Sequence, residues 1–470
     1  MNDCFKLWAP DAKTVELVLN EKVWPMKSEG NGWWYFKPDH LADKSRYGFK
    51  VNGEGPFPDP YSKSQPEGVH GLSQYFVSEY QWKIDEFTSA NLENAIIYEL
   101  HIGTFTEQGT FVAAIEKLDH LRQLGITHVE LMPVAAFPGK HGWGYDGVDL
   151  FSPHNGYGRP DDLKAFVDAC HQRNLAVILD VVYNHLGPDG NYLGLYGDYF
   201  SSRYHTPWGE AVNFDGENSD QVRKFVIDNA LFWLSEYRFD GLRLDAVHAI
   251  FDFSALHILE ELQLKVEELT LQTGRKLFLI AESDLNDPRI LNSREKGGYN
   301  LAAQWLDDFH HSVHVLLTQE QQGYYSDFSG KKDLIKCLNQ KFVYDGSFSE
   351  FRGRRHGRSC NELSAERFVV FLQNHDQIGN RAFGERMCHL VSFAQCQFAA
   401  AILLLCPFIP MLFQGEEWAA STPFLYFTDH VDQKLAKAVK EGRKKEFAGI
   451  SDRVPDPQAK DTYLASKLIW

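Results

Sequence analysis

The sequence predicts an α/β protein, a (β/α)8 TIM barrel preceded by an N-terminal β-sandwich domain. From Ala95 onward, eight strand-like runs alternate with amphipathic helical stretches such as DLKAFVDACHQRN and HILEELQLKVEELT, which is the pattern of repeated βα units. Eight such units indicate a closed barrel. The alternative, an open doubly wound sheet, more often carries a Gly-rich phosphate turn after its first strand, and none is present.

The expected barrel strands share runs of apolar and β-branched residues, and in chain order they span 95–105, 127–134, 176–185, 241–247, 278–283, 300–308, 367–376 and 407–417. The apolar run 398–413 is interrupted by Pro407 and Pro410. Because it is shorter than the roughly 20 residues that a membrane span needs, we expect a buried helix followed by a buried strand.

The expected domains are a β-sandwich over 1–84, the barrel over 85–430, and the start of a C-terminal region, incomplete, over 431–470. Short alternating runs such as TVELVL and GWWYFKP predict the sandwich, and the Pro- and Gly-rich segment 53–71 is expected to be irregular. The polar end of the chain has too few strand-like runs for a complete further domain.

The charge balance disfavours anionic partners. The chain has 470 residues, with 47 Lys and Arg against 64 Asp and Glu, a formal net charge of −17. Such a chain repels phosphate backbones and anionic membranes. We therefore expect no nucleic-acid or membrane partner, and we interpret the basic cluster FRGRRHGR (351–358) as a solvated loop.

The seven cysteines are odd in number and include no CxxC pair. This usage indicates reduced thiols, and disfavours both a disulfide framework and a zinc site. The N-terminal sequence MNDCFKLWAP lacks a basic region followed by an apolar run, so we expect no signal peptide and a cytoplasmic location. The sequence predicts nothing about the oligomeric state.

Charged and polar residues gather where the expected strands end, and in a (β/α)8 barrel these ends form the catalytic face. They are Asp180, Asn184, His185, Arg243, Asp245, His248, Glu282, Asp284, Asn374, His375 and Asp376. Each residue alone also fits a structural role, such as a buried ion pair, a core histidine or a loop anchor. The combination on one rim is more specific than any member and predicts an active site.

Within FDGLRLDAVH, the two-residue period of a strand places Arg243 and Asp245 on the same face. A neighbouring cation favours the ionised form of a carboxyl group, which a nucleophile requires. A second carboxyl group in a less positive setting can keep its proton and act as an acid.

Four short motifs resemble the conserved regions of the α-amylase superfamily of retaining glycoside hydrolases: DVVYNH, GLRLDAVH, the Glu of LIAES, and QNHD. Longer strings, among them PFPDPYSKSQPEGVHG, AESDLNDPR and QNHDQIGNRAFGER, resemble the malto-oligosyltrehalose trehalohydrolase family. That family cleaves the α-1,4 bond next to a terminal trehalose. The resemblance implies a malto-oligosaccharide-type substrate that ends in trehalose.

The resemblance also implies the catalytic roles. Asp245 would be the nucleophile, Glu282 the general acid and then base, and Asp376 would hold sugar hydroxyls and help to distort the ring. Around them we expect substrate-binding residues, namely Tyr145, Asp180, His185, Arg243, His248 and His375. Among these, Tyr145 would be an aromatic platform under the sugar at the cleavage point, and Arg243 would orient Asp245.

Two other functions remain open at this point. A glycogen branching enzyme has the same domain order and catalytic residues, but transfers the glucan to a 6-hydroxyl group. A non-catalytic glycan-binding barrel would tend to lose one of the three acids, and all three are present. We expect no cofactor and no metal, because the short loop after the third strand lacks a cluster of acids around Asn184.

Two further expectations concern the periphery of the site. Position alone suggests a set of residues for the trehalose-side pocket, with core packing as the alternative: Trp305, Asp307, Asp308, Tyr324 and Tyr325. Family members usually continue into a C-terminal β-domain, so we expect that domain to be absent or only partly present in 431–470.

Overall fold

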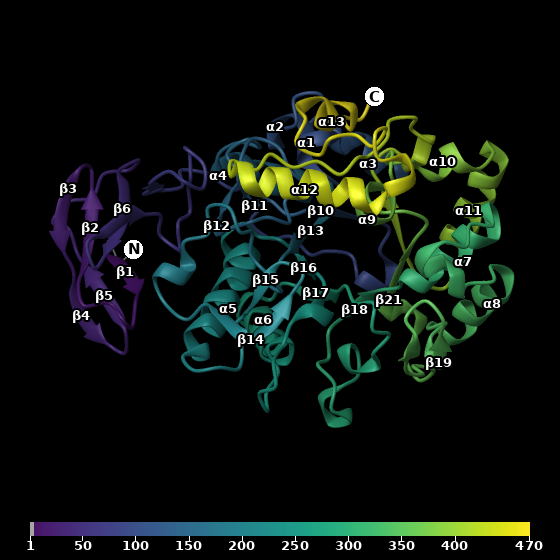
Figure 1. The fold of residues 1–470 in the computed structure, drawn as a ribbon, viewed down its shortest axis with the longest axis horizontal. Coiled ribbons are helices and arrows are strands. Elements are labelled where there is room, and N and C mark those ends of the chain that lie inside the picture. The colour runs from purple at the N-terminus through teal and green to yellow at the C-terminus, as the bar shows by residue number, and fades with distance from the viewer. Residues whose placement is uncertain (1–3) are drawn as a thin grey trace.

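The structure is a computed structural model that describes residues 4–470. Its centre is a closed barrel of eight parallel strands (Figure 1), as the sequence predicts. In chain order these strands are β9 (Ile97–Leu100), β10 (His128–Leu131), β13 (Ala176–Val181), β16 (Gly241–Leu244), β17 (Phe278–Ala281), β18 (Ala303–Trp305), β21 (Phe368–Phe371) and β22 (Ile409–Phe413). Each strand lies where one of the eight expected runs was placed.

The barrel register sets the positions of the charged residues. Asp180 of β13 is the Cα partner of Arg243 on β16, and Glu99 of β9 is the partner of Glu130 on β10. Nearly every strand residue is buried, as expected for a parallel sheet covered on both faces. Because all eight strands run parallel, their C-terminal ends meet at one rim.

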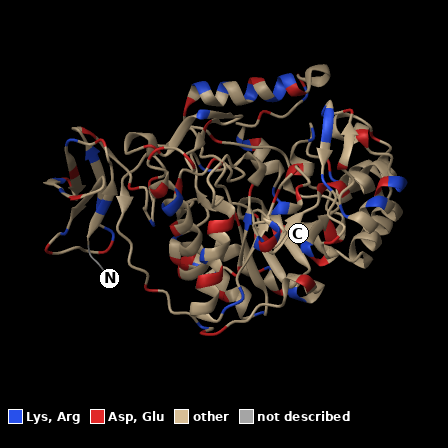
Figure 2. Ribbon diagram, turned by 90° about the horizontal axis from the view of Figure 1, so that it is seen from below, with Lys and Arg blue, Asp and Glu red and all other residues tan. Residues whose placement is uncertain are grey.

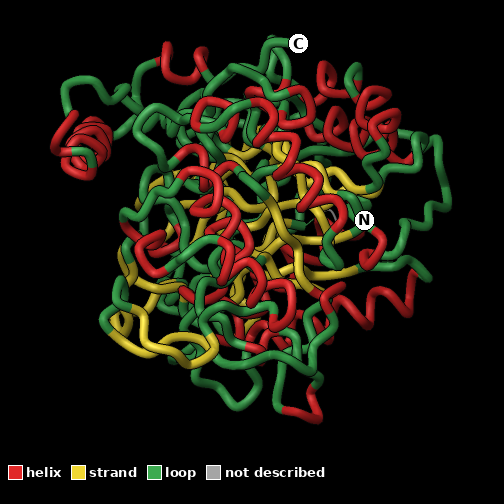
Figure 3. Tube along the Cα trace, turned by 90° about the vertical axis from the view of Figure 1, so that its right-hand side faces the viewer, coloured by secondary structure: helices red, strands yellow, loops and turns green. Residues whose placement is uncertain are grey.

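Helices surround the strands, which lie inside them in the view of Figure 3. The longer ones are α4 (Pro160–His171), α5 (Ser219–Glu236), α6 (Ile258–Thr273), α7 (Asp307–Thr318), α8 (Lys331–Gln340) and α11 (Phe393–Leu405). Local sequence fixes their ends: α4 begins with Pro160 followed by two aspartates, which suit a helix N-terminus. Helix α6 ends at Gly274 in the left-handed conformation, a common helix terminator.

The N-terminal region forms two antiparallel sheets, at the purple end of the ribbon in Figure 1. One contains β1 (Phe5–Trp8), β5 (Trp33–Phe36) and β4 (Lys27–Gly30); the other contains β3 (Lys22–Pro25), β2 (Val15–Leu19), β6 (Arg46–Val51), β7 (Glu54–Phe57) and β8 (Ser73–Gln74). Phe5, Leu7, Leu17 and Phe49 are buried within the core. The predicted sandwich is therefore confirmed.

Three details of the sequence prediction were wrong. The segment 53–71, expected to be irregular, contains the strand β7 (Glu54–Phe57). The first strand ends at Leu100, because the remainder of the expected run folds into the short helix α1 (Ile102–Phe105). The apolar helix α11 is largely exposed, with Phe393 65% and Leu405 85% accessible and only Ala399 and Leu403 buried. Apolar residues occupy every side of this helix, so composition could not indicate which side faces the barrel. The strand that follows it, β22, is buried as expected.

The C-terminal region contains α12 (Gln433–Glu446) and α13 (Lys460–Ala465). In Figure 1, α12 crosses in front of the barrel as a separate yellow helix. Its start is capped by the Asp432 side chain, which accepts hydrogen bonds from two backbone N–H groups.

Charges are mixed over the molecule. In the view of Figure 2, basic and acidic residues are interspersed on the barrel and its covering helices. The basic cluster 351–358 falls on the hairpin of β19 (Asp345–Ser349) and β20 (Arg354–Gly357), where Arg354 and Arg355 are exposed.

All seven cysteines are free thiols. Within residues 4–470, no helix combines the length and apolar character that crossing a bilayer requires.

Candidate active site

A cleft of about 570 Å³ opens at the C-terminal rim of the barrel. Seven of the nine residues predicted for the site line it: Tyr145, His185, Asp245, His248, Glu282, His375 and Asp376. The other two, Asp180 and Arg243, lie beneath its floor and are 2% and 0% exposed. The structure therefore gathers the whole predicted set at one place.

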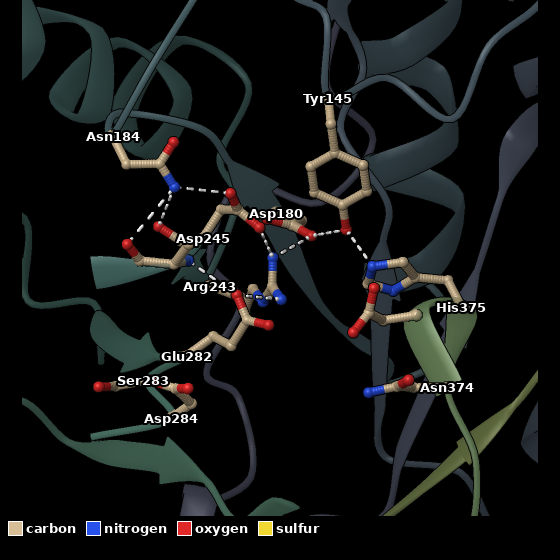
Figure 4. Close-up of polar contacts among 12 residues, drawn as sticks. Tyr145, Asp180, Asn184, Arg243, Asp245, Glu282, Ser283, Asp284, Asn374 and His375 are labelled. Atoms are coloured by element: carbon tan, nitrogen blue, oxygen red, sulfur yellow. Dashed lines mark hydrogen bonds and ion pairs between the residues drawn. The ribbon is translucent and has the colours of Figure 1, made fainter. Parts of the chain in front are cut away.

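Arg243 contacts three carboxyl groups from three neighbouring strands (Figure 4). Its Nη1 donates to Asp180 Oδ2 at 2.7 Å and to Asp245 Oδ1 at 2.9 Å. Its Nη2 lies 2.9 Å from Glu282 Oε2, an ion pair without hydrogen-bond alignment. The ring of Trp305 lies beneath the guanidinium, 4.2 Å from Cζ. The buried Arg243 guanidinium thus holds the three acids together. Hydrogen bonds between such charged groups are stronger than those between neutral groups.

Asp245 and Glu282 are the two of these acids that reach the cleft. Their side chains are 11% and 18% exposed, against 1% for Asp180. Because both touch the same guanidinium and come from adjacent strand ends, they lie close together at the cleft floor. This arrangement suits the roughly 5–5.5 Å carboxyl separation of retaining glycosidases.

Further contacts fix each of these two carboxyl groups. Asn184 Nδ2 donates to Asp245 Oδ2 at 2.8 Å and to the Asp245 carbonyl at 2.9 Å. Ala246, the next residue, has φ +38° in the left-handed region, and its N–H donates to Glu282 Oε2 at 2.7 Å. A non-glycine residue in this conformation costs on the order of 1–2 kcal/mol, and strain of this kind clusters at functional sites.

A chain of hydrogen bonds joins Asp180, Tyr145 and His375, as Figure 4 shows. The Tyr145 hydroxyl lies 2.6 Å from Asp180 Oδ2 and 2.8 Å from His375 Nε2. Burial raises the pKa of Tyr145 well above its usual range, and the charge of Asp180 adds to the rise. Tyr145 therefore keeps its proton and acts as a donor. Burial also raises the pKa of Asp180, to about 7, although Arg243 opposes the rise.

Asp376 is the third acid of the predicted set. It follows His375 in α9 (His375–Gly379), and its Oδ1 accepts a hydrogen bond from Asn380 Nδ2 at 2.6 Å. Burial raises its pKa, and the neighbouring Glu282 carboxyl adds to this effect, whereas His375 opposes it.

The histidines of the cleft differ in environment. His185 Nε2 lies 2.9 Å from the Tyr145 carbonyl, and burial lowers the pKa of His185 to about 4. Trp208 stacks on its ring at 4.2 Å with an interplanar angle of 8°. His248 is more exposed, and its Nε2 lies 3.9 Å from Asp284 Oδ1. Trp208 and His248 thus offer a flat aromatic face and a polar edge to a ligand in the cleft.

Comparison with known proteins relates this geometry to a family. Residues 57–207 match the family described as "Alpha amylase, catalytic domain", and residues 3–64 match "Carbohydrate-binding module 48 (Isoamylase N-terminal domain)". A malto-oligosyltrehalose trehalohydrolase of Arthrobacter ramosus is 50% identical over 479 aligned residues, covering 100% of this chain and 83% of the relative. That of Saccharolobus solfataricus strain P2 is 47% identical over 467, covering 99% and 82%. The chain belongs to the malto-oligosyltrehalose trehalohydrolase family.

A solved structure supports the same relationship. A crystal structure from Salmonella typhimurium, described as that of a candidate alpha amylase, superimposes with a TM-score of 0.94 at 43% identity. The match covers 99% of this chain and 80% of that one. The barrel and sandwich of this trehalohydrolase family member therefore follow a fold already seen by experiment.

Some residues of the cleft and its supporting contacts were not predicted from the sequence of this trehalohydrolase family member. Asn184 was noted as a strand-end residue and in the expectation about a metal, but not as the hydrogen-bond partner of Asp245 that it is. Trp208 was not among the predicted residues, and nothing in the sequence around it indicated that it stacks on His185. Arg443 and Glu446 of α12 line the cleft, although the C-terminal region was considered only as the start of a further domain.

None of the residues suggested for a trehalose-side pocket lines the cleft, and most of them fit the packing alternative. Trp305, Asp308 and Tyr325 are buried in the barrel or its covering layer, at 1%, 3% and 5% exposure. Tyr324 is partly buried, and its hydroxyl donates to Gln377 Oε1 at 3.1 Å. Burial raises the pKa of Asp307, and the charges of Glu282 and Asp376 raise it further. Asp307 therefore lies near the acids of the cleft.

The described residues also bear on metal binding. Among residues 4–470, no group of three or more His, Cys, Asp or Glu side chains is arranged to hold a metal ion. The Asn184 amide nitrogen faces the carboxylate and backbone of Asp245, and the amide oxygen contacts His185 Nδ1.

Proposed function

We propose that this chain hydrolyses the α-1,4 bond next to the terminal trehalose of malto-oligosyl trehalose and releases trehalose. The observation that carries the proposal is the pair of carboxyl groups, Asp245 and Glu282, on one buried guanidinium at the floor of an open cleft. Similarity to the trehalohydrolases extends over nearly the whole chain at 43–50% identity, and this supports the choice of substrate.

The proposed reaction has two steps. In the first, the Asp245 carboxylate attacks the anomeric carbon of the sugar at the cleavage point, while Glu282 gives its proton to the departing trehalose oxygen. In the second, Glu282 takes a proton from water, whose oxygen displaces Asp245 from that carbon. The product keeps the α configuration because each step inverts the anomeric centre once.

Other residues support these steps. Arg243 and Asn184 hold the two oxygens of Asp245, so the nucleophile is oriented before substrate enters. Tyr145 and His375 lie beside the nucleophile and present a flat surface, because their rings stack with centroids 5.0 Å apart. We propose that Tyr145, His185, His248, His375 and Asp376 contact the sugars from the cleft wall. The seven free thiols suit a reducing compartment, and we propose a cytoplasmic location.

One comparison of substrates tests the proposal. The chain is incubated separately with malto-oligosyl trehalose, with plain malto-oligosaccharides and with amylose, and the products are separated. We expect free trehalose as the main product of the first, with plain malto-oligosaccharides cleaved far more slowly. New α-1,6 branches on amylose would favour a branching enzyme, and binding without any product would favour a glycan-binding barrel.

A further inference from the structure

We propose that Glu99 is a positioning residue for the reaction: it fixes the ring of His375 so that both ring nitrogens act as donors and the ring faces Tyr145 as a cation. Glu99 belongs to β9 and was not among the residues predicted for the site. The inference rests on the proposed function, because it assigns to that reaction a group that does not itself line the cleft.

Glu99 makes two hydrogen bonds to His375. Its Oε2 accepts a hydrogen bond from the backbone N–H of His375 at 3.0 Å, and its Oε1 accepts one from ring Nδ1. Both side chains are buried, at 1% exposure for Glu99 and 4% for His375. Since one carboxylate holds both the backbone and the ring, it sets the position and the rotation of the imidazole.

The hydrogen-bond directions determine the protonation of the ring. Asp180 Oδ2 already accepts from Arg243, so the Tyr145 hydroxyl donates to it as well. The Tyr145 oxygen is then free to accept, and His375 Nε2 at 2.8 Å must carry the hydrogen. Nδ1 must carry one too, because the Glu99 carboxylate is an acceptor. A ring with both nitrogens protonated is an imidazolium cation.

The charged groups around His375 support this state. Burial by itself lowers the pKa of His375, but the charge of Glu99 and its hydrogen bond raise it above the usual value. Arg243 opposes this rise from β16, and Asp376 in the same helix adds to it. The other groups on this side are Tyr145, Asp180 and two tryptophan rings, Trp143 and Trp305, with centroids 5.6 and 6.1 Å from the imidazole. His101 is also near enough for the charge of His375 to lower the pKa of His101. Glu99 is therefore the acid on which the cation depends most.

The adjacent strand supplies a matched control. Glu130 is the Cα partner of Glu99 across β9 and β10 and is equally buried, at 1% exposure. Its two carboxyl oxygens have no hydrogen-bond partner within the described chain. Burial and the charge of Glu99 raise the pKa of Glu130 well above its usual range, which favours its uncharged form. Glu130→Gln changes the same residue type in the same layer without touching His375.

The first test compares kcat/KM of the full chain against pH for the wild type, Glu99→Gln and Glu130→Gln. Losing the anion makes the imidazolium give up its proton at lower pH. We therefore expect Glu99→Gln to lower kcat/KM by about tenfold or more. The alkaline limb of its pH profile, where kcat/KM falls, should move to lower pH by about one unit or more. Glu130→Gln should keep the alkaline limb of the wild type and stay within about twofold of wild-type kcat/KM, because Glu130 has no hydrogen bond to His375 and does not line the cleft. An unshifted limb in Glu99→Gln, or an equal shift in both variants, would overturn the proposal.

A second measurement does not depend on the stability of Glu99→Gln or on turnover. In wild-type protein labelled with 15N-histidine, the ring signals that disappear in His375→Gln belong to His375. At pH 7 these signals should show two protonated nitrogens, whereas a neutral ring would contradict the proposal. If the wild type releases no trehalose, the proposed function fails, and this spectrum still decides the state of His375.

Discussion

Replacing Asp245 with Asn is expected to lower kcat for trehalose release by on the order of 10⁴-fold or more, as loss of a covalent nucleophile does in other enzymes. The amide cannot form the glycosyl ester, although it keeps the shape of the side chain. Asn184 Nδ2 and Arg243 Nη1 would then face a neutral group in place of a carboxylate. Initial rates of trehalose formation at saturating substrate measure the effect.

Asp284→Asn is the matched control for this substitution. Asp284 lies at the same rim, pairs with Arg352 at 3.1 Å and lies 3.9 Å from His248, but it is outside the cleft lining. Its substitution should keep kcat within about fivefold, since exposed ion pairs contribute little. Turnover by Asp245→Asn within tenfold of the wild type, with the thermal unfolding midpoint unchanged, would show that Asp245 is not the nucleophile.

Replacing Glu282 with Gln is expected to lower kcat by roughly 10²–10⁴-fold, the usual contribution of a general acid and base. The loss should depend on the leaving group. Trehalose needs a proton on its departing oxygen, whereas fluoride leaves without one. With α-maltotriosyl fluoride, formation of the glycosyl-enzyme should therefore be much less impaired than with malto-oligosyl trehalose.

The measurement for Glu282 is the single-turnover rate of each variant with the two substrates. Glu130→Gln again serves as control, because Glu130 is an equally buried barrel acid without contact to the cleft. Equal losses for Glu282→Gln with both substrates would contradict a role in protonating the leaving group. They would instead indicate that Glu282 acts only through its ion pair with Arg243.

The barrel could be predicted because each strand is a compact run of apolar residues flanked by polar ones. The residues at which the strands begin and end could not be predicted. The run 95–105 contains a strand and a short helix, and only three residues of the run 300–308 pair as a strand. Apolar residues fit a buried helix and a buried strand equally well, so composition does not separate them. Helix α11 shows the same limit, because its apolar surface is mostly exposed.

The predicted site residues lie together because parallel strands bring their C-terminal ends to one rim. The contacts between them were less accessible. That Glu99 reaches His375 depends on how a side chain in the first strand approaches a helix that begins 276 residues later. Likewise Arg443 reaches the cleft only because α12 crosses the barrel, which the sequence of that helix does not indicate. Spacing along the chain cannot supply such relations between distant segments.

The configuration of the first sugar product tests most directly whether Asp245 and Glu282 act in turn on one glycosidic bond. Malto-oligosyl trehalose is mixed with the enzyme in a proton NMR tube, and the new reducing-end signal is recorded before mutarotation equilibrates the anomers. Double displacement predicts that the α-anomer appears first and the β-anomer only later. A β-anomer formed first would mean direct attack by water, and would contradict a covalent role for Asp245.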